Sequence, residues 1–345
     1  MYFEISASGS FTDACQYLVD KATKALFKIK QLDVHRNVSV ALRLFHSLIY
    51  PILSYGSDIW GAFLMNLNSN SDFYEVSESL PVEKVLINFA KYILMVRKNS
   101  SHVAVRGELG LYPLACKIIM SVCKNWNRIA NSDPTTYIRK TYMEYCENSK
   151  NDNDSCNYSS NLKNVFDFFN HESIWQNQGY RKLHGVPKTL EDCIFASYRS
   201  SWKNALMGSD KLETYRKFKN ELKMENYLSF GTNESRQKFT KLRISAHRLQ
   251  IELGRHRKPE SIPRELRVCL RCNSGAIDDE FHAVMKCNKF NSERNNLFLA
   301  LKDFSMFNNL GSDYDKFLFL MKRASIDLDY HKLLTPIVKK IFDSC

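Results

Sequence analysis

The residues of this sequence best suited to chemistry are three cysteines and one histidine near the C-terminal end. They are Cys269, Cys272, His282 and Cys287, in the pattern Cys-x2-Cys, nine residues, His, four residues, Cys. Three thiolates and one imidazole form a donor set that tetrahedral zinc accepts in proteins. Because the protein would fill all four positions, the pattern predicts one structural Zn²⁺ rather than a catalytic ion. The alternative is four unrelated buried residues, since free cysteine is common in protein cores.

The local sequence around the cluster favours the turns that a metal site needs. Gly275 follows the Cys-x2-Cys pair and suits a reversal of the chain. His282 and Cys287 are five residues apart, a spacing that a short helical turn brings to one ion. The carboxylates of residues 278–280 are adjacent and point in different directions, so we do not expect them to share an ion. We expect Asp279 or Glu280 to cap the helix of His282 or to hold a metal ligand in place.

A strongly basic segment leads into the cluster. Residues 236–271 contain eleven basic and three acidic residues, a local net charge of +8. Such a segment can neutralise phosphates, which predicts contact with RNA or DNA; the alternative is an ordinary solvated helix face. The predicted contacts are Arg236, Lys238, Lys241, Arg243, Arg248, Arg255, Arg257, Lys258, Arg264, Arg267 and Arg271.

The composition of the 345 residues favours helices and a polyanionic partner. Glycine (12) and proline (8) are scarce, while 22 Phe and 17 Tyr can build a core, so the fold class is predicted as mainly α. The net charge of +12 suits nucleic acid, although basic surfaces also occur without an anionic partner.

The ten cysteines show no paired framework outside the cluster, and neither a signal peptide nor an apolar stretch of 18 residues is visible. We therefore expect a nuclear or cytoplasmic protein in a reducing compartment, with no membrane partner. No Gly-rich phosphate loop, Gly-x-Ser-x-Gly motif or nucleophile–base spacing is present, so no catalytic residue and no small-molecule substrate are predicted. His247 is expected to be packed or hydrogen-bonded, and Trp60 to anchor the core.

The pattern of apolar residues predicts helices along most of the chain. We expect a short strand or turn over residues 2–12, a helix starting at Thr12, a second from about 39 to 49 that Pro51 kinks, and a loop over 66–79. Pro81 is predicted to start the next helix. The predicted organisation is an N-terminal helical domain (1–145), a polar linker (146–163), a basic helical domain (164–260), the Cys/His module (261–290) and C-terminal helices (291–345).

Six blocks, in order along the chain, resemble the region C-terminal to the polymerase core of LINE-type non-LTR retrotransposon reverse transcriptases. They are residues 2–11, 44–60 (with Pro51, Tyr55-Gly56 and Trp60), 89–94, 106–113, 239–255 and the Cys/His cluster. The resemblance implies that residues 1–145 form a thumb-like helical bundle that grips a template–primer duplex. It also implies that the basic segment and the zinc module position RNA or target DNA during RNA-directed DNA synthesis.

The sequence departs from that family in ways that limit the transfer. The catalytic aromatic-x-Asp-Asp turn of the polymerase is not found in this sequence, so no polymerase residue is carried over. The nine residues between Cys272 and His282 exceed the spacing of the small retroviral knuckle, so its RNA readout is not carried over either. A domesticated host zinc protein that acts as a nucleic-acid or protein scaffold stays open as an alternative, as does a decayed reading frame.

Overall fold

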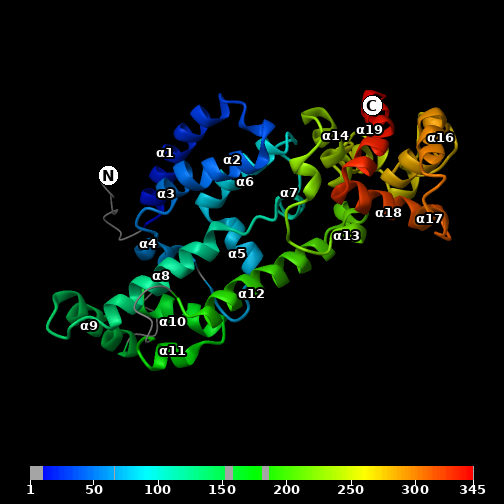
Figure 1. The fold of residues 1–345 in the computed structure, drawn as a ribbon. Coiled ribbons are helices and arrows are strands. Elements are labelled where there is room, and N and C mark those ends of the chain that lie inside the picture. Colours follow the sequence, from blue (N-terminus) through cyan, green and yellow to red (C-terminus); the bar gives the residue numbers. More distant parts are fainter. Residues whose placement is uncertain (1–10, 66, 152–157, 181–185, 345) are drawn as a thin grey trace. The chain divides into compact units, whose positions relative to one another are not determined.

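The computed structural model describes residues 11–65, 67–151, 158–180 and 186–344 (Figure 1). The regular secondary structure of this part of the chain is helical, with no strand and only isolated bridges between Leu109 and Met224 and between Val268 and Ile277. The prediction of a mainly α fold is confirmed. Residues 2–10, predicted as a strand or turn, lie outside the described residues.

The chain divides into two compact units, each assembled from separate stretches of sequence. The first comprises residues 1–33, 40–89 and 112–204, and the second comprises residues 34–39, 90–111 and 205–345. Three helices, α2 (Val38–Leu44), α6 (Pro81–Ile93) and α12 (Lys188–Met207), each contain a boundary between the two units. The other helices of the first unit are α1 (Thr12–Lys30), α3 (Tyr50–Leu53), α4 (Ser57–Leu64), α5 (Phe73–Ser79), α8 (Leu114–Ala130), α9 (Tyr137–Asn151), α10 (Tyr158–Phe168) and α11 (Glu172–Gln176).

Large aromatic side chains fill the core of the first unit, where α4 packs along α8. Trp60 of α4 is fully buried, and its indole N–H donates to the Tyr55 carbonyl at 2.9 Å, which confirms its predicted role as a core anchor. Trp126 of α8 is equally buried and packs on Phe166 and Trp175. A buried indole needs a partner for its N–H, and both indoles have one.

The helix starts follow the sequence signals, with one exception. α1 begins at Thr12 and α6 at Pro81, as predicted, and a π-helical turn over Phe45–Ile49 precedes Pro51. The loop predicted over residues 66–79 holds for residues 67–72 and is wrong for the rest, because α5 occupies Phe73–Ser79. The Asp72 carboxylate accepts from the backbone N–H groups of Tyr74 and Glu75, and Phe73 is buried among aromatic rings. A cap and one buried ring stabilise a helix too short to show a periodic pattern.

The segment predicted as a linker, residues 146–163, contains the end of α9 and the start of α10. These two helices pack together within the first unit, on either side of residues 152–157, which lie outside the described residues. The polar segment therefore connects two helices of the same unit. The chain passes from one unit to the other elsewhere, within α2, α6 and α12 and at residues 33–34 and 111–112.

The second unit is built from shorter helices and many irregular turns. Its helices after α7 (His102–Leu109) are α13 (Tyr215–Phe218), α14 (Asn233–Arg243), α15 (Gln250–Leu253), α16 (Asn291–Ala300), α17 (Ser305–Asn308), α18 (Asp313–Ile326) and α19 (Leu328–Asp343). α14 and α18 both pack on α19. Thr232, Ser312 and Asp327 cap these three helices through side-chain oxygens that accept backbone N–H groups.

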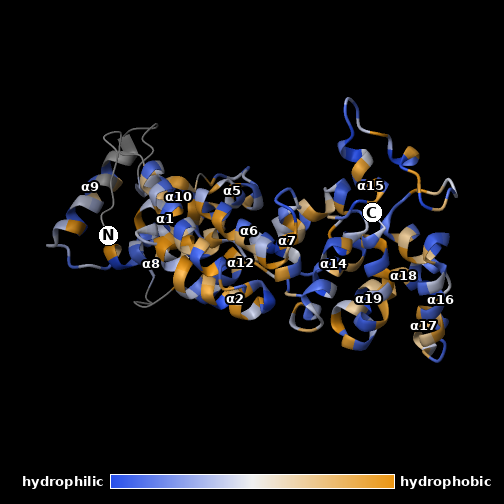
Figure 2. Cartoon of the chain, turned by 90° about the horizontal axis from the view of Figure 1, so that it is seen from above, coloured by the Kyte–Doolittle hydropathy of each residue, from blue (hydrophilic) through white to orange (hydrophobic). Residues whose placement is uncertain are grey.

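Apolar and polar residues are mixed on most helices, as expected for helices with one buried face (Figure 2). Within the described residues no single helix is both long and apolar enough to cross a membrane. The pair Val38–Leu53 and Ser57–Leu64 reaches that length and composition together, with a bend of 79° at the break. The cysteines in the described ranges are all free thiols.

Candidate metal centre

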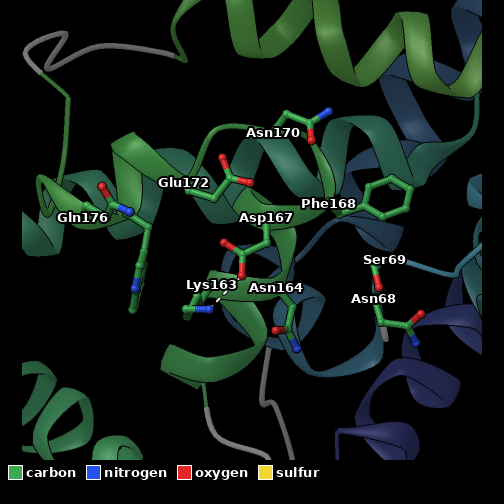
Figure 3. A pocket seen from close by; sticks show the side chains of 10 residues that line it. Asn68, Ser69, Lys163, Asn164, Asp167, Phe168, Asn170, Glu172 and Gln176 are labelled. Carbon is green, nitrogen blue, oxygen red and sulfur yellow. Dashed lines mark hydrogen bonds and ion pairs between the residues drawn. The ribbon is translucent and has the colours of Figure 1, made fainter.

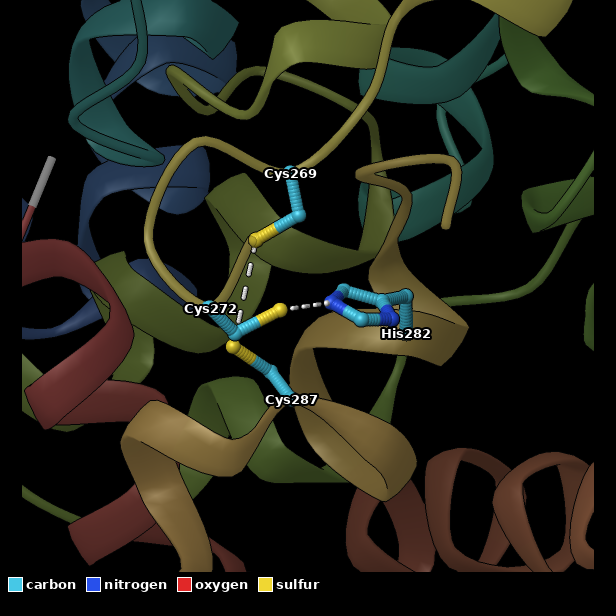
Figure 4. A group of neighbouring side chains, drawn as sticks. All are labelled: Cys269, Cys272, His282 and Cys287. Carbon is cyan, nitrogen blue, oxygen red and sulfur yellow. Dashed lines mark hydrogen bonds between the residues drawn. The ribbon is translucent and has the colours of Figure 1, made fainter. Parts of the chain in front are cut away.

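The four predicted ligands converge on one point of the second unit (Figure 4). Their ligand atoms all lie within 4.8 Å of one another. The sulfur atoms of Cys269 and Cys287 are 3.9 Å apart, and Cys272 Sγ lies 3.4 Å from His282 Nε2. For a tetrahedral ion with metal–sulfur bonds of about 2.3 Å and metal–nitrogen bonds of about 2.0 Å, these separations should be about 3.8 and 3.5 Å. Two of the separations therefore match tetrahedral coordination, and all four ligand atoms lie close enough to hold one ion.

A tight turn, closed by the isolated bridge between Val268 and Ile277, presents the first two ligands. The backbone N–H of Cys269 donates to the Ala276 carbonyl at 2.8 Å, and that of Asp278 donates to the Arg267 carbonyl at 2.8 Å. Between these bonds the chain reverses at Gly275, which has a φ of +70°. The predicted role of Gly275 is confirmed, because this backbone conformation carries no penalty in glycine.

A single π-helical turn, His282–Lys286, presents the other two ligands. The N–H of Cys287 donates to the His282 carbonyl at 2.8 Å, an i to i+5 bond that places the two side chains on the same side of the turn. Asp279 caps this turn by accepting the His282 N–H at 2.8 Å, as predicted. Arg294 of α16 is buried and donates to the Cys287 carbonyl at 3.0 Å, which closes the C-terminal end.

The three adjacent carboxylates serve three different parts of the module, as their alternating directions predicted. Asp278 accepts the Gln250 N–H at 2.8 Å and pairs with Arg271, which ties the metal module to α15. Glu280 points into the protein and accepts hydrogen bonds from Ser245 at 2.7 Å and from His247 Nε2 at 2.8 Å. Each of the three is thus bonded to donors of the protein, and each serves a different part of the module.

The hydrogen bonds of His247 define its tautomer. The backbone N–H of Leu249 donates to Nδ1 at 3.3 Å, so Nε2 carries the proton and donates it to Glu280. Burial alone would raise the pKa of Glu280, but the contacts with His247 and Ser245 outweigh burial and lower this pKa to about 2. His247 is thus a buried, hydrogen-bonded residue, as predicted.

The cysteine ligands differ in acidity. Burial opposes ionisation of Cys272, but hydrogen bonds with Ser274 and the other ligands outweigh it and lower the pKa of this thiol to about 6. Burial raises the pKa of Cys287 to about 12 and also raises that of Cys269. Cys272 is the thiol that ionises most readily at neutral pH, and a bound cation would favour the thiolate form of all three.

The predicted phosphate contacts separate into buried and exposed side chains. Arg243 is buried and bonded to Glu108 and Glu225, so its assignment as a phosphate contact is corrected. Arg236 is also buried, donating to the carbonyls of Leu228 and Arg36, and the same correction applies. Arg267 is the third buried arginine and donates to backbone carbonyls of residues 251 and 262.

Four more of the predicted contacts are half-buried and paired with acids. Lys238 pairs with Glu234 and Asp343, Arg255 with Glu252, Arg264 with Glu213, and Arg271 with Asp278. Their charge is partly neutralised by these internal partners, which reduces what they can offer to a phosphate.

Four predicted contacts have no acidic partner in the described ranges. Arg248, Arg257 and Lys258 are exposed, and Lys241 is half-buried. The three exposed side chains stand on either side of α15, immediately before it and after the 3₁₀ turn Gly254–His256 that follows it. The positive surface left for a polyanion is thus smaller than the local charge of +8 suggests.

A separate cavity of about 640 Å³ lies in the first unit (Figure 3). Its wall carries amide side chains such as Asn164 and Gln176, the ring of Trp175, and Lys163, which pairs with Asp167 at 2.8 Å. Among the described residues that line it there is no cysteine or histidine, and the single cation, Lys163, is already paired. These residues offer no nucleophile–base arrangement.

Sequence reasoning missed two supports of the metal module. Arg294 was not singled out, because a lone arginine in a helix carries no local signal that it will bond to carbonyls of a preceding turn. The partners of Glu280 were missed for the same reason, since Ser245 lies 35 residues away in sequence. Comparison of the chain with models of protein families, with curated proteins and with solved structures finds no match.

Proposed function

We propose that this chain is a nucleic-acid-binding protein whose Cys/His module holds one structural Zn²⁺. The observation that carries the proposal is the position of three exposed cations, Arg248, Arg257 and Lys258, which have no acidic partner among the described residues. They lie in the segment that runs directly into the four-ligand site. Such cations can bind phosphates by releasing counterions, and a rigid module beside them fixes their position.

The ligand set favours zinc over other metals. Three thiolates and one imidazole are soft to borderline donors, and their separations suit tetrahedral coordination. The protein would fill all four positions, with Cys269, Cys272, His282 and Cys287. A bound ion would therefore link the turn at Gly275 to the π-helical turn. It would supply folding free energy rather than a reactive water.

The resemblance to LINE-type reverse transcriptases supports the same function. In that family the corresponding region positions RNA or target DNA for a polymerase, and this chain would do so with its exposed cations. A nuclear or cytoplasmic location and an RNA or DNA partner follow from this proposal. By itself the chain is expected to bind nucleic acid without extending a primer.

Binding to a labelled single-stranded RNA and to a DNA duplex, measured by fluorescence anisotropy at several salt concentrations, tests the proposal. The variant Arg248→Ala/Arg257→Ala/Lys258→Ala should flatten the dependence of log K on log salt by up to about 2–3, at about 0.7–0.9 per lost phosphate contact. The control Lys302→Ala/Lys332→Ala/Lys340→Ala removes three exposed cations elsewhere in the second unit and should leave the slope unchanged. Equal slopes for the two variants, with circular dichroism showing both folded, would contradict the proposal.

One observation favours a protein scaffold as the second candidate. Leu266 and Leu270 of the module are 63% and 69% exposed, and Leu253 of α15 is 44% exposed. Exposed leucines beside exposed cations suit an acidic, apolar protein surface as well as a nucleic acid. If the wild-type chain shows no salt-dependent binding to either nucleic acid, the scaffold becomes the better explanation.

A further inference from the structure

A small cavity in the second unit lies between two segments that are far apart in sequence. Residues 97–100, which precede α7, form one side, and residues 245–256 form the other. Its volume is about 40 Å³. A water molecule needs roughly 10–15 Å³ of such space, so the cavity has room for about three oxygen-sized groups, enough for the two non-bridging oxygens of one backbone phosphate.

Ser100 brings an unpaired hydroxyl to this cavity. The residue is 3% exposed, and its Oγ has no hydrogen-bond partner within the described residues. Leaving a buried hydroxyl unpaired costs about 1–3 kcal/mol, so natural structures rarely retain one without a use. A ligand oxygen in the cavity would accept this hydrogen bond.

Two cations and a histidine also line the wall. Arg97 and His256 are exposed and border the cavity from opposite segments, and Lys211 lines it as well. The one carboxylate in the wall, Glu252, is bonded to Lys211 at 3.1 Å and to Arg255 at 3.2 Å. Glu252 is therefore neutralised by two cations, and Arg97 is left without an acidic partner in the described part of the chain.

A further cation stands near the same place. Burial lowers the pKa of Lys241, and the positive charges of Arg97 and Lys238 lower it further. The pKa of a lysine falls when like charges crowd it, so Lys241 lies in a positive environment to which Arg97 contributes. A bound anion would offset this positive charge.

We propose that the cavity formed by Arg97, Ser100, Lys211 and His256 is a phosphoryl-binding subsite that holds one backbone phosphate of a nucleic acid. The inference rests on the proposed function and extends it, since Arg97 and Ser100 lie outside the basic segment 236–271. The backbone would pass between residues 97–100 and 255–258, where Arg257 and Lys258 continue the positive path.

Two variants and one matched control test the subsite. Arg97→Glu reverses the exposed charge, and Ser100→Ala removes only the unpaired hydroxyl. Lys302→Glu changes the net charge as Arg97→Glu does, at an exposed position of the same unit. Each zinc-loaded full-length protein is measured in two ways: anisotropy with a labelled single-stranded RNA, and thermal unfolding in inorganic phosphate against chloride at equal ionic strength.

We expect Arg97→Glu to weaken RNA binding by about tenfold at low salt, and Ser100→Ala to weaken it by about threefold, the worth of one hydrogen bond. Ser100→Ala should keep or raise the stability of the free protein, because it removes an unsatisfied buried group. Lys302→Glu should change RNA binding by less than about twofold. Inorganic phosphate should stabilise wild type and Lys302→Glu more than the two cavity variants.

The two readouts separate the subsite from the proposed function. If RNA binds wild type but Arg97→Glu and Lys302→Glu bind equally, the subsite is wrong and the function stands. If no RNA binds but phosphate stabilises the protein only when Arg97 and Ser100 are intact, the subsite stands as a phosphate site and the function is wrong. If phosphate stabilises all variants equally and RNA binding is unchanged in Ser100→Ala, the inference is overturned.

Discussion

The guanidinium of Arg243 donates hydrogen bonds to the carboxylate of Glu108, although the two residues are 135 positions apart in the sequence. Nε of Arg243 lies 3.1 and 3.0 Å from the two carboxylate oxygens, and Nη2 lies 3.0 Å from one of them. Both side chains are buried, at 1% and 0% exposure. Nη2 also meets Glu225 at 3.1 Å, and Nη1 donates to the Met321 carbonyl. One side chain of the basic segment thus links α14 to α7, to residue 225 and to α18.

Removal of this link should unfold the second unit far more easily than removal of an exposed arginine. Arg243→Ala would leave the carboxylate of Glu108 buried and unpaired, so we expect a loss of about 3–5 kcal/mol in the free energy of unfolding. Arg248→Ala, five residues on and exposed, is the control and should lose less than about 0.5 kcal/mol. Urea denaturation of both variants measures the difference. Similar losses for the two would mean that the ion pair contributes little.

The same network predicts a dependence of stability on pH. Burial by itself raises the pKa of Glu225, but Arg243 and Lys219 outweigh it and hold this pKa below its ordinary value of 4.5. A carboxyl group with a lowered folded-state pKa contributes stability above pH 4.5 and loses it as the pH falls below that value. The unfolding free energy of wild type should therefore fall more steeply below that pH than that of Glu225→Gln.

Glu221→Gln removes one exposed carboxylate from the same segment and controls for the change in charge. Its unfolding free energy should follow wild type over the acidic range, as measured by urea denaturation at a series of pH values. A Glu225→Gln curve that runs parallel to wild type would show that Glu225 does not titrate abnormally.

The metal module predicts a defined stoichiometry. Purified protein should contain about one zinc ion per chain, and Cys272→Ser should lose it and loosen the module, because metal binding is part of its folding free energy. Cys193→Ser, in the first unit, should keep the ion, since this thiol only bonds to the Phe169 carbonyl. Elemental analysis by mass spectrometry and thermal unfolding measure both effects. Full retention of zinc in Cys272→Ser would rule out the assigned ligand set.

Two glycines with left-handed backbone conformations should differ in how much stability is lost when each is replaced by alanine. At Gly110, with φ of +62°, an added Cβ would lie 2.4 Å from the Met224 backbone nitrogen, so we expect a loss of about 2–4 kcal/mol from strain and overlap. At Gly275, with φ of +70°, nothing lies within 4 Å of the added atom, so only the backbone strain of about 1 kcal/mol remains. Urea denaturation of the two variants tests the contrast, and an equal cost would show that Met224 moves aside freely.

The sequence by itself determined the features that depend on neighbouring residues. The donors of the metal cluster lie within a single stretch of 19 residues, from Cys269 to Cys287, so the turns at Gly275 and His282 suffice to gather them. The helix start at Pro81 and the cap at Asp279 were predictable for the same reason, because a cap bonds to backbone groups within one turn of itself.

Only the tertiary structure decided which cations face outward. Arg243 and Arg248 are the same residue type in one basic segment, yet the first is buried and the second is exposed. What separates them is Glu108, which reaches Arg243 because residues 90–111 join residues 205–345 in one unit. No residue near Arg243 in the sequence indicates that Glu108 is its partner. A buried charge is stabilised by partner groups that the fold brings close to it. A local sequence pattern does not show where in the chain those partners lie.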